Sequence, residues 1–251
     1  MMKYETILFQ EERNIGRLTL NRPGALNALN QKMIEELEHL FDELAASETV
    51  RVLILTGAGE KGFCSGLDMK ETAPSLFGQP IEIIYKYQCR TSQLYYKMRC
   101  IPQPIIAAIH GAASGGGFSF AMAADVRLIT PEARFNASYI NIGLGGADLA
   151  SSYFLPRLIG AGRANEFLLT GDFMTAEMAV QLGFASRMVP RERLMDAAYE
   201  IADKMAGKDP LGLRMTKEAI NQNLDVSSLE EALHLENRNQ GLLIAKMKMN
   251  V

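Results

Sequence analysis

Tryptophan is absent from this sequence, and cysteine and histidine are scarce, with three residues of each among 251. Cys64, Cys89 and Cys100 lie far apart and form no CxxC pair, which argues against a disulfide framework or a zinc site and favours a reducing compartment. No apolar run approaches the roughly 18 residues that span a bilayer, and the N-terminus lacks the apolar core of a signal peptide. We therefore expect a cytoplasmic protein with no metal site and no membrane partner.

A basic surface is missing as well. The chain has 26 Lys and Arg residues against 29 Asp and Glu residues, a formal net charge of −3, which argues against binding to nucleic acid or to an anionic membrane. Nucleotide motifs are also missing: there is no GxxxxGK(S/T) sequence, and Gly115 and Gly117 are not followed by the third glycine of a dinucleotide fingerprint. Any anionic ligand must therefore be held by a few local cations and by backbone N–H groups.

Strand and helix signals alternate along the first half of the chain, and helices dominate after residue 148. The apolar patterns predict strands at residues 6–10, 15–20, 51–56, 104–110 and 125–130, and a further run at 184–189 at a sheet edge. They predict helices around residues 34–44, 80–98, 149–158, 163–169, 176–182, 191–205, 210–221 and 229–246, and one that begins near 118. Residues 57–68 are expected to form a loop and 111–117 a tight turn. This order indicates an α/β core followed by a helical C-terminal part.

Two glycine-rich segments are the places where the backbone could approach a ligand closely. Residues 63–68 (FCSGLD) are mostly small, and residues 114–117 (SGGG) follow a buried strand and open a helix. The N–H groups at a helix N-terminus carry a partial positive charge, and two such groups aimed at one point form an oxyanion hole, worth about 3–4 kcal/mol per donor. The same glycines would also suit a tight turn and close helix–sheet packing, so either segment alone leaves both interpretations open.

Further motifs surround these segments in a fixed order. They are residues 21–23 (NRP), 26–29 (LNAL), 62–68 (GFCSGLD), 104–111 (PIIAAIHG), 114–117 (SGGG), 124–125 (AD), 155–160 (LPRLIG), 169–171 (LTG), 176–183 and 189–190 (VP). In order and spacing they resemble the crotonase (enoyl-CoA hydratase/isomerase) superfamily, from about residue 4 to about residue 240.

The resemblance implies an α/β crotonase (ClpP-like) fold. Residues 1–190 would form a spiral core of repeated ββα units that carries the acyl-CoA site, and residues 191–251 a C-terminal helical region that builds trimers. The implied substrate is an acyl-CoA thioester, with coenzyme A as part of the substrate and no separate cofactor. The implied assembly is a homotrimer, or a hexamer made of two trimers.

The resemblance also assigns roles to individual residues. It places an oxyanion hole at the backbone N–H groups of Leu67 and Gly116, and it adds the dipole of the helix that begins at Gly116. The adenine would lie against the backbone near Leu26 and residues 64–66. Arg22 and Lys70 are candidate phosphate partners, although exposed cations are more often only solvated. The substrate-binding residues implied in this way are Arg22, Leu26, Cys64, Ser65, Gly66, Lys70, Gly115, Ser119 and Tyr139.

Two of these positions depart from the hydratases of the family, which use two glutamates to position water and to move protons. The matching positions here are Ser119 and Tyr139. Neither hydroxyl is an effective base near pH 7, since the ordinary pKa of tyrosine is about 10. The departure argues against the two-glutamate mechanism, and Tyr139 argues against the single-glutamate isomerases as well.

One acid remains near these positions. Asp148 lies eight residues before Pro156, as an aspartate does in the similar dienoyl-CoA isomerases, and it precedes a Ser-Ser-Tyr run that resembles the 4-chlorobenzoyl-CoA dehalogenases. It could equally be the N-cap of the helix predicted from residue 149. We expect Asp148 to be the acid/base of a hydratase or isomerase reaction that passes through an enolate. The alternatives are a hydrolase or dehalogenase-like enzyme with Asp148 as nucleophile, and an inactive protein that binds acyl-CoA.

Overall fold

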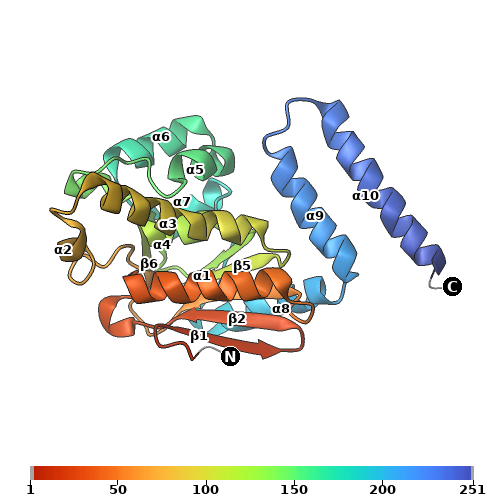
Figure 1. Cartoon of the computed structure of the whole chain (residues 1–251), viewed down its shortest axis with the longest axis horizontal. Helices are drawn as coiled ribbons and strands as arrows, with labels where there is room; N and C mark the ends of the chain where they lie inside the picture. Colours follow the sequence, from red (N-terminus) through yellow and green to blue (C-terminus); the bar gives the residue numbers. More distant parts are fainter. Residues whose placement is uncertain (1–2, 250–251) are drawn as a thin grey trace.

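The computed structural model describes residues 3–249, in which two β-sheets are packed among helices and a pair of helices extends from this body (Figure 1). The larger sheet has the strand order β1-β2-β3-β5-β7-β10, and the smaller sheet has the order β4-β6-β8-β9. The strands of the larger sheet are β1 (Ile7–Glu12), β2 (Ile15–Leu20), β3 (Val52–Gly57), β5 (Ile105–Ile109), β7 (Val126–Ile129) and β10 (Arg187–Met188). Those of the smaller sheet are β4 (Gly62–Cys64), β6 (Ala112–Ser114), β8 (Arg134–Asn136) and β9 (Met174–Thr175).

Each repeat of the chain gives one strand to each sheet. β3, β5 and β7 run parallel in the larger sheet, and the strands that directly follow them, β4, β6 and β8, run parallel in the smaller one. Within the described residues, antiparallel pairing is confined to β1 with β2 and to β8 with β9. The α/β class and the repeated strand–strand–helix unit predicted for this chain are confirmed.

Helices cover both faces of the larger sheet. The α-helices are α1 (Gln31–Ala46), α2 (Ala73–Leu76), α3 (Ile81–Cys100), α4 (Gly116–Ala123), α5 (Ser151–Ile159), α6 (Ala161–Thr170), α7 (Ala176–Gln181), α8 (Leu194–Ala206), α9 (Pro210–Asn223) and α10 (Leu229–Met249). Three 3-10 helices are η1 (Pro23–Ala25), η2 (Ile140–Ile142) and η3 (Arg191–Arg193). α1 buries Leu37, Leu40 and Phe41 in one apolar core, and α8 buries Leu194 and Ala198 in the other.

The central strands of the larger sheet are buried on both faces. Leu53 and Leu55 of β3 belong to the core that α1 covers, whereas Val52 and Ile54 belong to the core that α8 covers. A parallel sheet covered on both faces needs continuous apolar runs of this kind. This requirement explains why the sequence predicts the central strands β3, β5 and β7 correctly to within one residue. The edge strand β10 lies inside the run 184–189 but begins three residues after its start.

The sequence does not predict the short strands of the smaller sheet. β4 lies within residues 57–68, which the sequence predicts to be a loop, and β6 lies within residues 111–117, which it predicts to be a tight turn. β8 also falls outside every predicted strand. These predictions are wrong because a strand of three residues is too short to show an alternation of apolar and polar side chains.

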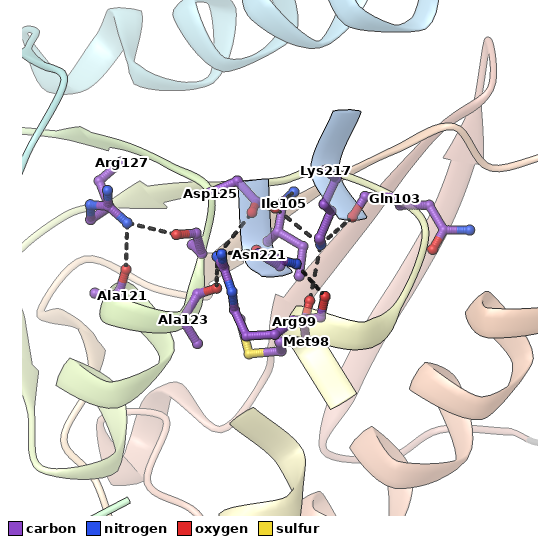
Figure 2. A network of polar contacts seen from close by, with 11 residues as sticks. Met98, Arg99, Gln103, Ile105, Ala121, Ala123, Asp125, Arg127, Lys217 and Asn221 are labelled. Atoms are coloured by element: carbon purple, nitrogen blue, oxygen red, sulfur yellow. Dashed lines mark hydrogen bonds and ion pairs between the residues drawn. The ribbon is translucent and has the colours of Figure 1, made fainter. Parts of the chain in front are cut away.

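A buried polar network attaches α9 to the body, and α10 extends beside α9 (Figures 1 and 2). Lys217 of α9 is buried, and its Nζ donates hydrogen bonds to the carbonyl oxygens of Met98 at 3.0 Å and Gln103 at 2.7 Å. The same Nζ lies 3.1 Å from Asp125 Oδ2, and Asp125 also pairs with Arg99 at 2.9 Å. Burial lowers the pKa of Lys217, and the carboxylate of Asp125 opposes that change. α9 is thus attached by a buried polar side chain as well as by Leu213, which packs against the core that α8 covers.

No helix within residues 3–249 combines the length and the apolar character that a membrane span requires. Nor do His, Cys, Asp or Glu side chains of these residues gather in a group of three or more that could hold a metal ion. Cys64, Cys89 and Cys100 are free thiols, so no disulfide contributes to the stability of the fold.

Replacement of the buried ammonium should loosen α9. In Lys217→Met, the carbonyl oxygens of Met98 and Gln103 lose their donor, while Asp125 keeps Arg99 as a partner. We expect the free energy of unfolding in urea to fall by about 2–3 kcal/mol, since a buried polar group without a partner costs about 1–3 kcal/mol. Lys246→Met is the matched control: it removes a half-exposed ion pair with Asp209, worth about 0–1 kcal/mol. Equal losses in the two variants would contradict the anchoring role of Lys217.

Candidate active site

The two glycine-rich segments lie against each other, because β4 and β6 are neighbours in the smaller sheet. A Cβ atom added at Gly66 would lie 2.8 Å from the carbonyl oxygen of Ser114 and 3.1 Å from the backbone nitrogen of Gly116. A Cβ added at Gly117 would lie only 2.0 Å from the carbonyl oxygen of Cys64. No side chain fits in either place, so glycine is required for the contact between the two turns.

The backbone N–H of Leu67 is left without a partner by the way its neighbours pair. Leu29 N donates to Gly66 O at 2.7 Å, and Asp68 N donates to Leu29 O at 2.9 Å. Leu29 and Leu67 thus form a parallel bridge, in which Leu29 bonds to the residues on either side of Leu67. In such a bridge the N–H of Leu67 itself points away from Leu29. Within residues 3–249, neither Leu67 N nor Gly116 N donates a hydrogen bond. Two free backbone donors therefore belong to two turns that touch each other.

Gly116 is the first residue of α4, an eight-residue helix that is buried along its whole length. Tyr95 of α3 donates from its hydroxyl to the carbonyl oxygen of Gly116 at 3.0 Å, which fixes the orientation of this first turn. Gly115, just before it, has φ +51° and ψ −120°, a conformation that suits glycine. The N-terminal end of α4 and its partial positive charge are thus held at the contact between the two turns.

Two cations hold the other end of the same helix (Figure 2). Arg99 donates to the carbonyl oxygen of Ala123 at 3.2 Å, and Arg127 donates to those of Ala121 at 3.3 Å and Ala124 at 2.6 Å. Burial lowers the pKa of Arg127 to about 10, so its guanidinium stays charged at neutral pH. Positive charge at a helix C-terminus complements the helix dipole, and here it stabilises a helix that is buried along its whole length.

Asp148 lies in a strained segment before α5. Leu149 and Ala150 both have left-handed backbone conformations, with φ +46° and +65°, which cost about 1–3 kcal/mol each in non-glycine residues. Asp148 Oδ1 accepts hydrogen bonds from Leu149 N at 2.8 Å and from the side-chain amide of Gln88 on α3. Asp148 N donates to Ser151 Oγ at 3.1 Å. These contacts place the carboxyl group at a single site between α3 and α5.

The N-cap role predicted as an alternative for Asp148 is wrong. α5 begins at Ser151 rather than at Leu149, and the residue before it is Ala150 in a left-handed conformation. The side chain of Asp148 bonds to Leu149 N and to Gln88, not to the first turn of the helix. Burial raises the pKa of Asp148, and these two hydrogen bonds oppose that rise. Within the described residues the carboxylate, which is half-buried, forms no ion pair.

Ser119 and Tyr139 bring neutral hydroxyl groups to this region. Ser119 is fully buried in α4, and its Oγ has no hydrogen-bond partner within the described residues. The ring of Tyr139 lies against Gly115, where an added Cβ would be 3.5 Å from the ring atom Cδ1, and its hydroxyl lies 3.4 Å from the carbonyl oxygen of Asp148. Burial raises the pKa of Tyr139, so its hydroxyl stays protonated at neutral pH.

Arg22 meets carboxylates of its own chain. Its guanidinium lies 2.8 Å from Asp68 Oδ2 and 2.6 Å from Glu71 Oε2, and it also donates to Ala28 O at 2.7 Å. Lys70 is exposed, its backbone N–H donates to Asp68 Oδ1 at 3.0 Å, and its ammonium forms no ion pair within the described residues. Of the two cations expected near a phosphate, Arg22 is therefore already paired with carboxylates, whereas Lys70, among residues 3–249, is not.

The remaining residues of the expected coenzyme A site surround the turn after β4. Leu26 is exposed, has φ +52°, and accepts a hydrogen bond at its carbonyl oxygen from Ser65 N at 3.1 Å. Cys64 is fully buried, and burial raises the pKa of its thiol to about 12, so it stays neutral. Leu26, Ser65 and Gly66 are thus brought together as the sequence suggests, with Cys64 beneath them.

Sequence patterns do not reveal several residues of this region. Gln88 and Tyr95 are ordinary positions of a long helix, and nothing in their spacing connects them to Asp148 or Gly116. Arg127 interrupts an apolar strand, and this interruption is the one sequence signal of a buried cation at that position. The other contacts join residues far apart in the chain and appear only in the folded structure.

Known proteins resemble this chain over nearly its whole length. A family model described as enoyl-CoA hydratase/isomerase matches residues 10–250. A probable enoyl-CoA hydratase, echA12, of Mycobacterium leprae is 39% identical over 226 residues, which cover 88% of this chain and 76% of that protein. The 1,2-epoxyphenylacetyl-CoA isomerase of Escherichia coli is 33% identical over 245 residues, 95% of this chain and 90% of that one. The crystal structure of enoyl-CoA hydratase from Bacillus anthracis matches with a TM-score of 0.90 at 33% identity, covering 96% of this chain and 92% of that chain.

The half-buried carboxylate of Asp148 should reduce the stability of the fold at neutral pH. Because its pKa is raised in the folded state, the cost is absent below the ordinary Asp pKa of about 3.9 and grows as the pH rises through the folded pKa. Asp148→Asn keeps an oxygen for Leu149 N and Gln88 but carries no charge. We expect this variant to unfold about 2–4 °C above wild type at pH 7, and to show no gain near pH 4.

Asp172→Asn, at an exposed position of the same chain, is the control and should change the unfolding temperature little at either pH. Scanning calorimetry at the two pH values measures the difference. An Asp148→Asn protein that is less stable than wild type at both values would show that the carboxylate supports the fold.

Proposed function

The chain belongs to the enoyl-CoA hydratase/isomerase family, whose members act on acyl-CoA thioesters, and we propose that it does so through an enolate that two backbone N–H groups stabilise and Asp148 protonates. The family resemblance and the crotonase fold expected from the sequence are both confirmed. The observation that carries the proposal is the pair of free N–H groups, at Leu67 and Gly116, on two turns in contact.

We assign the first step to these donors. When a proton leaves a carbon next to the thioester, negative charge develops on the thioester oxygen. Donors already held in place stabilise that charge without reorganising, and each contributes about 10²–10³-fold in rate. The N-terminus of α4 adds its partial positive charge at Gly116.

We assign the proton transfers to Asp148. Burial raises the pKa of Asp148 toward neutral pH. A group with a pKa nearer the working pH can act as a general base when charged and as a general acid when protonated. The family resemblance places Ser119 and Tyr139 at the positions where hydratases carry glutamates, and both are neutral hydroxyls here. Moving a double bond needs one group that takes a proton from one carbon and returns it to another, whereas adding water needs a second group to activate the water. The residues therefore favour an isomerase over a hydratase.

The coenzyme A part would follow the turn after β4. We propose that the adenine lies against Leu26 and residues 64–66, with Gly115 beside the thioester. We expect Lys70 to meet the phosphates, because the guanidinium of Arg22 is already paired with Asp68 and Glu71. The residues from 191 onward, which include the extended α9 and α10, would carry the contacts of a homotrimer, or of a hexamer of two trimers (Figure 1).

Removal of the acid should abolish turnover without abolishing binding. We expect Asp148→Asn to lower kcat by about 10²–10⁴-fold on a panel of enoyl- and dienoyl-CoA esters, with KM little changed, since general acid–base catalysis contributes about that much. Asp172→Asn should keep the wild-type rate. Unchanged kcat in Asp148→Asn would eliminate the proposed role.

The same panel separates the two alternatives. A nucleophilic Asp148 would leave an acyl or aryl group on its peptide, which mass spectrometry of trapped enzyme would detect. A protein that only binds acyl-CoA would show tight binding by calorimetry and no turnover of any ester by wild type. Turnover without an adduct supports the proton-transfer mechanism.

Gly66 offers a test of the backbone donors. Gly66→Ala and Gly183→Ala both place an alanine at positive φ, +88° and +76°, but only the first puts Cβ against Ser114 O and Gly116 N; the second meets nothing within 4 Å. Backbone strain should cost each variant about 1–2 kcal/mol of stability, and Gly66→Ala should lose more because its Cβ also meets backbone atoms. We expect only Gly66→Ala to lose about 10²–10³-fold in kcat, because it separates the two turns. Equal kcat in both variants would show that the contact of the turns does not serve catalysis.

A further inference from the structure

Gln88 reaches Asp148 from a different part of the chain. It lies in the first half of α3, and its side-chain amide donates to Asp148 Oδ1. The other hydrogen bond to this oxygen, from Leu149 N at 2.8 Å, comes from the residue next to Asp148. Gln88 is therefore the group that ties the carboxylate to the rest of the fold.

The two oxygens of this carboxylate differ in their surroundings. Oδ1 accepts both hydrogen bonds, whereas Oδ2 accepts none within residues 3–249. A carboxylate oxygen with two donors is a poor place for a proton, because the proton would have to displace a donor. The oxygen without donors is the one that can take a proton and return it.

We propose that Gln88 is a positioning residue that holds Asp148 Oδ1, so that Oδ2 faces the substrate and exchanges the proton. This inference rests on the proposed function, because it names the group that orients the carboxyl group of Asp148 and lowers its pKa in the same site. Gln88 neither touches the reacting atoms nor transfers a proton in this scheme.

Few other groups near Asp148 can change its pKa. Tyr139 contributes a hydroxyl 3.4 Å from the carbonyl oxygen of Asp148, and Tyr95 of α3 lies nearby on Gly116 O. Burial raises the pKa of both phenols, so both are neutral when Asp148 titrates. Within the described residues no Lys or Arg pairs with Asp148. The amide of Gln88 is thus the one side-chain donor that favours the charged carboxylate.

The backbone supports the same arrangement. Left-handed conformations at Leu149 and Ala150 turn Leu149 N back onto Oδ1 and bring Ser151 Oγ to Asp148 N. The backbone thus holds Oδ1 from within the segment that carries Asp148, and Gln88 holds the same oxygen from α3. Without Gln88, Leu149 N would be the one donor left to Oδ1 within the described residues, and the pKa of Asp148 would rise because a donor to the charged form is lost.

The direct test is the titration of the Asp148 carboxyl group in the free, full-length protein. Selective ¹³C labelling of aspartate carboxyl carbons gives one NMR signal per residue, and Asp148→Asn identifies the signal by its disappearance. In Gln88→Leu, which removes the donor, we expect the pKa of Asp148 to rise by about one unit. In Gln88→Glu, which places a second carboxylate there, it should rise further, because like charges disfavour ionisation. Gln93→Leu, an exposed change on the same helix, should leave the titration unchanged.

Kinetics on the same variants then separate positioning from a structural role. If Asp148 must be charged to start the reaction, the acid limb of kcat/KM moves to higher pH by the same amount as the NMR titration. Identical titration curves for wild type and Gln88→Leu would overturn the proposal, even if the variant were slower. Full activity of Asp148→Asn would instead refute the proposed function, while the NMR titration would still decide whether Gln88 holds the carboxylate.

Discussion

The contact between two glycine turns sets the geometry of this molecule. Gly117 lies so close to β4 that a Cβ atom would be 2.0 Å from the carbonyl oxygen of Cys64, and a Cβ atom at Gly66 would be 2.8 Å from the carbonyl oxygen of Ser114. This distance is possible because β4 and β6 pair in the smaller sheet, each carried there by a strand of the larger one. The double sheet therefore serves to bring two short turns together, and the free N–H groups of Leu67 and Gly116 follow from that approach.

α4 extends this constraint through the protein. Its first turn belongs to the site, and its last turn is held by Arg99 and Arg127 (Figure 2). Arg99 in turn pairs with Asp125, which lies 3.1 Å from Lys217 of α9. The polar network that attaches α9 thus ends on the helix that presents Gly116. The fully buried helix α4 connects the two, so the site and the extended helices share one support.

Sequence patterns predict those parts of the molecule that repeat or that require a special residue. The apolar runs identify the larger sheet because it is covered on both faces, and the glycine segments identify the two turns because no other residue fits. The three-residue strands of the smaller sheet escape prediction because they show no period. The interpretation of Asp148 as an N-cap fails because the chain makes two left-handed turns before α5, at Leu149 and Ala150, which are not glycines. Gln88 escapes because its partner is distant in sequence.

The hydroxyls of Ser119 and Tyr139 have a consequence for the charge of the site. Two carboxylates at these positions would stand close to Asp148, and like charges would raise its pKa and hold it protonated. Neutral hydroxyls remove that repulsion, so Asp148 can ionise although burial opposes it. In the mechanism that we propose, Asp148 is then the negative group that takes a proton, and the N-terminus of α4 at Gly116 is the positive end that holds the resulting oxyanion. Adding carboxylates would supply a base for water, but it would also raise the pKa of Asp148 and leave less of that group charged to take a proton.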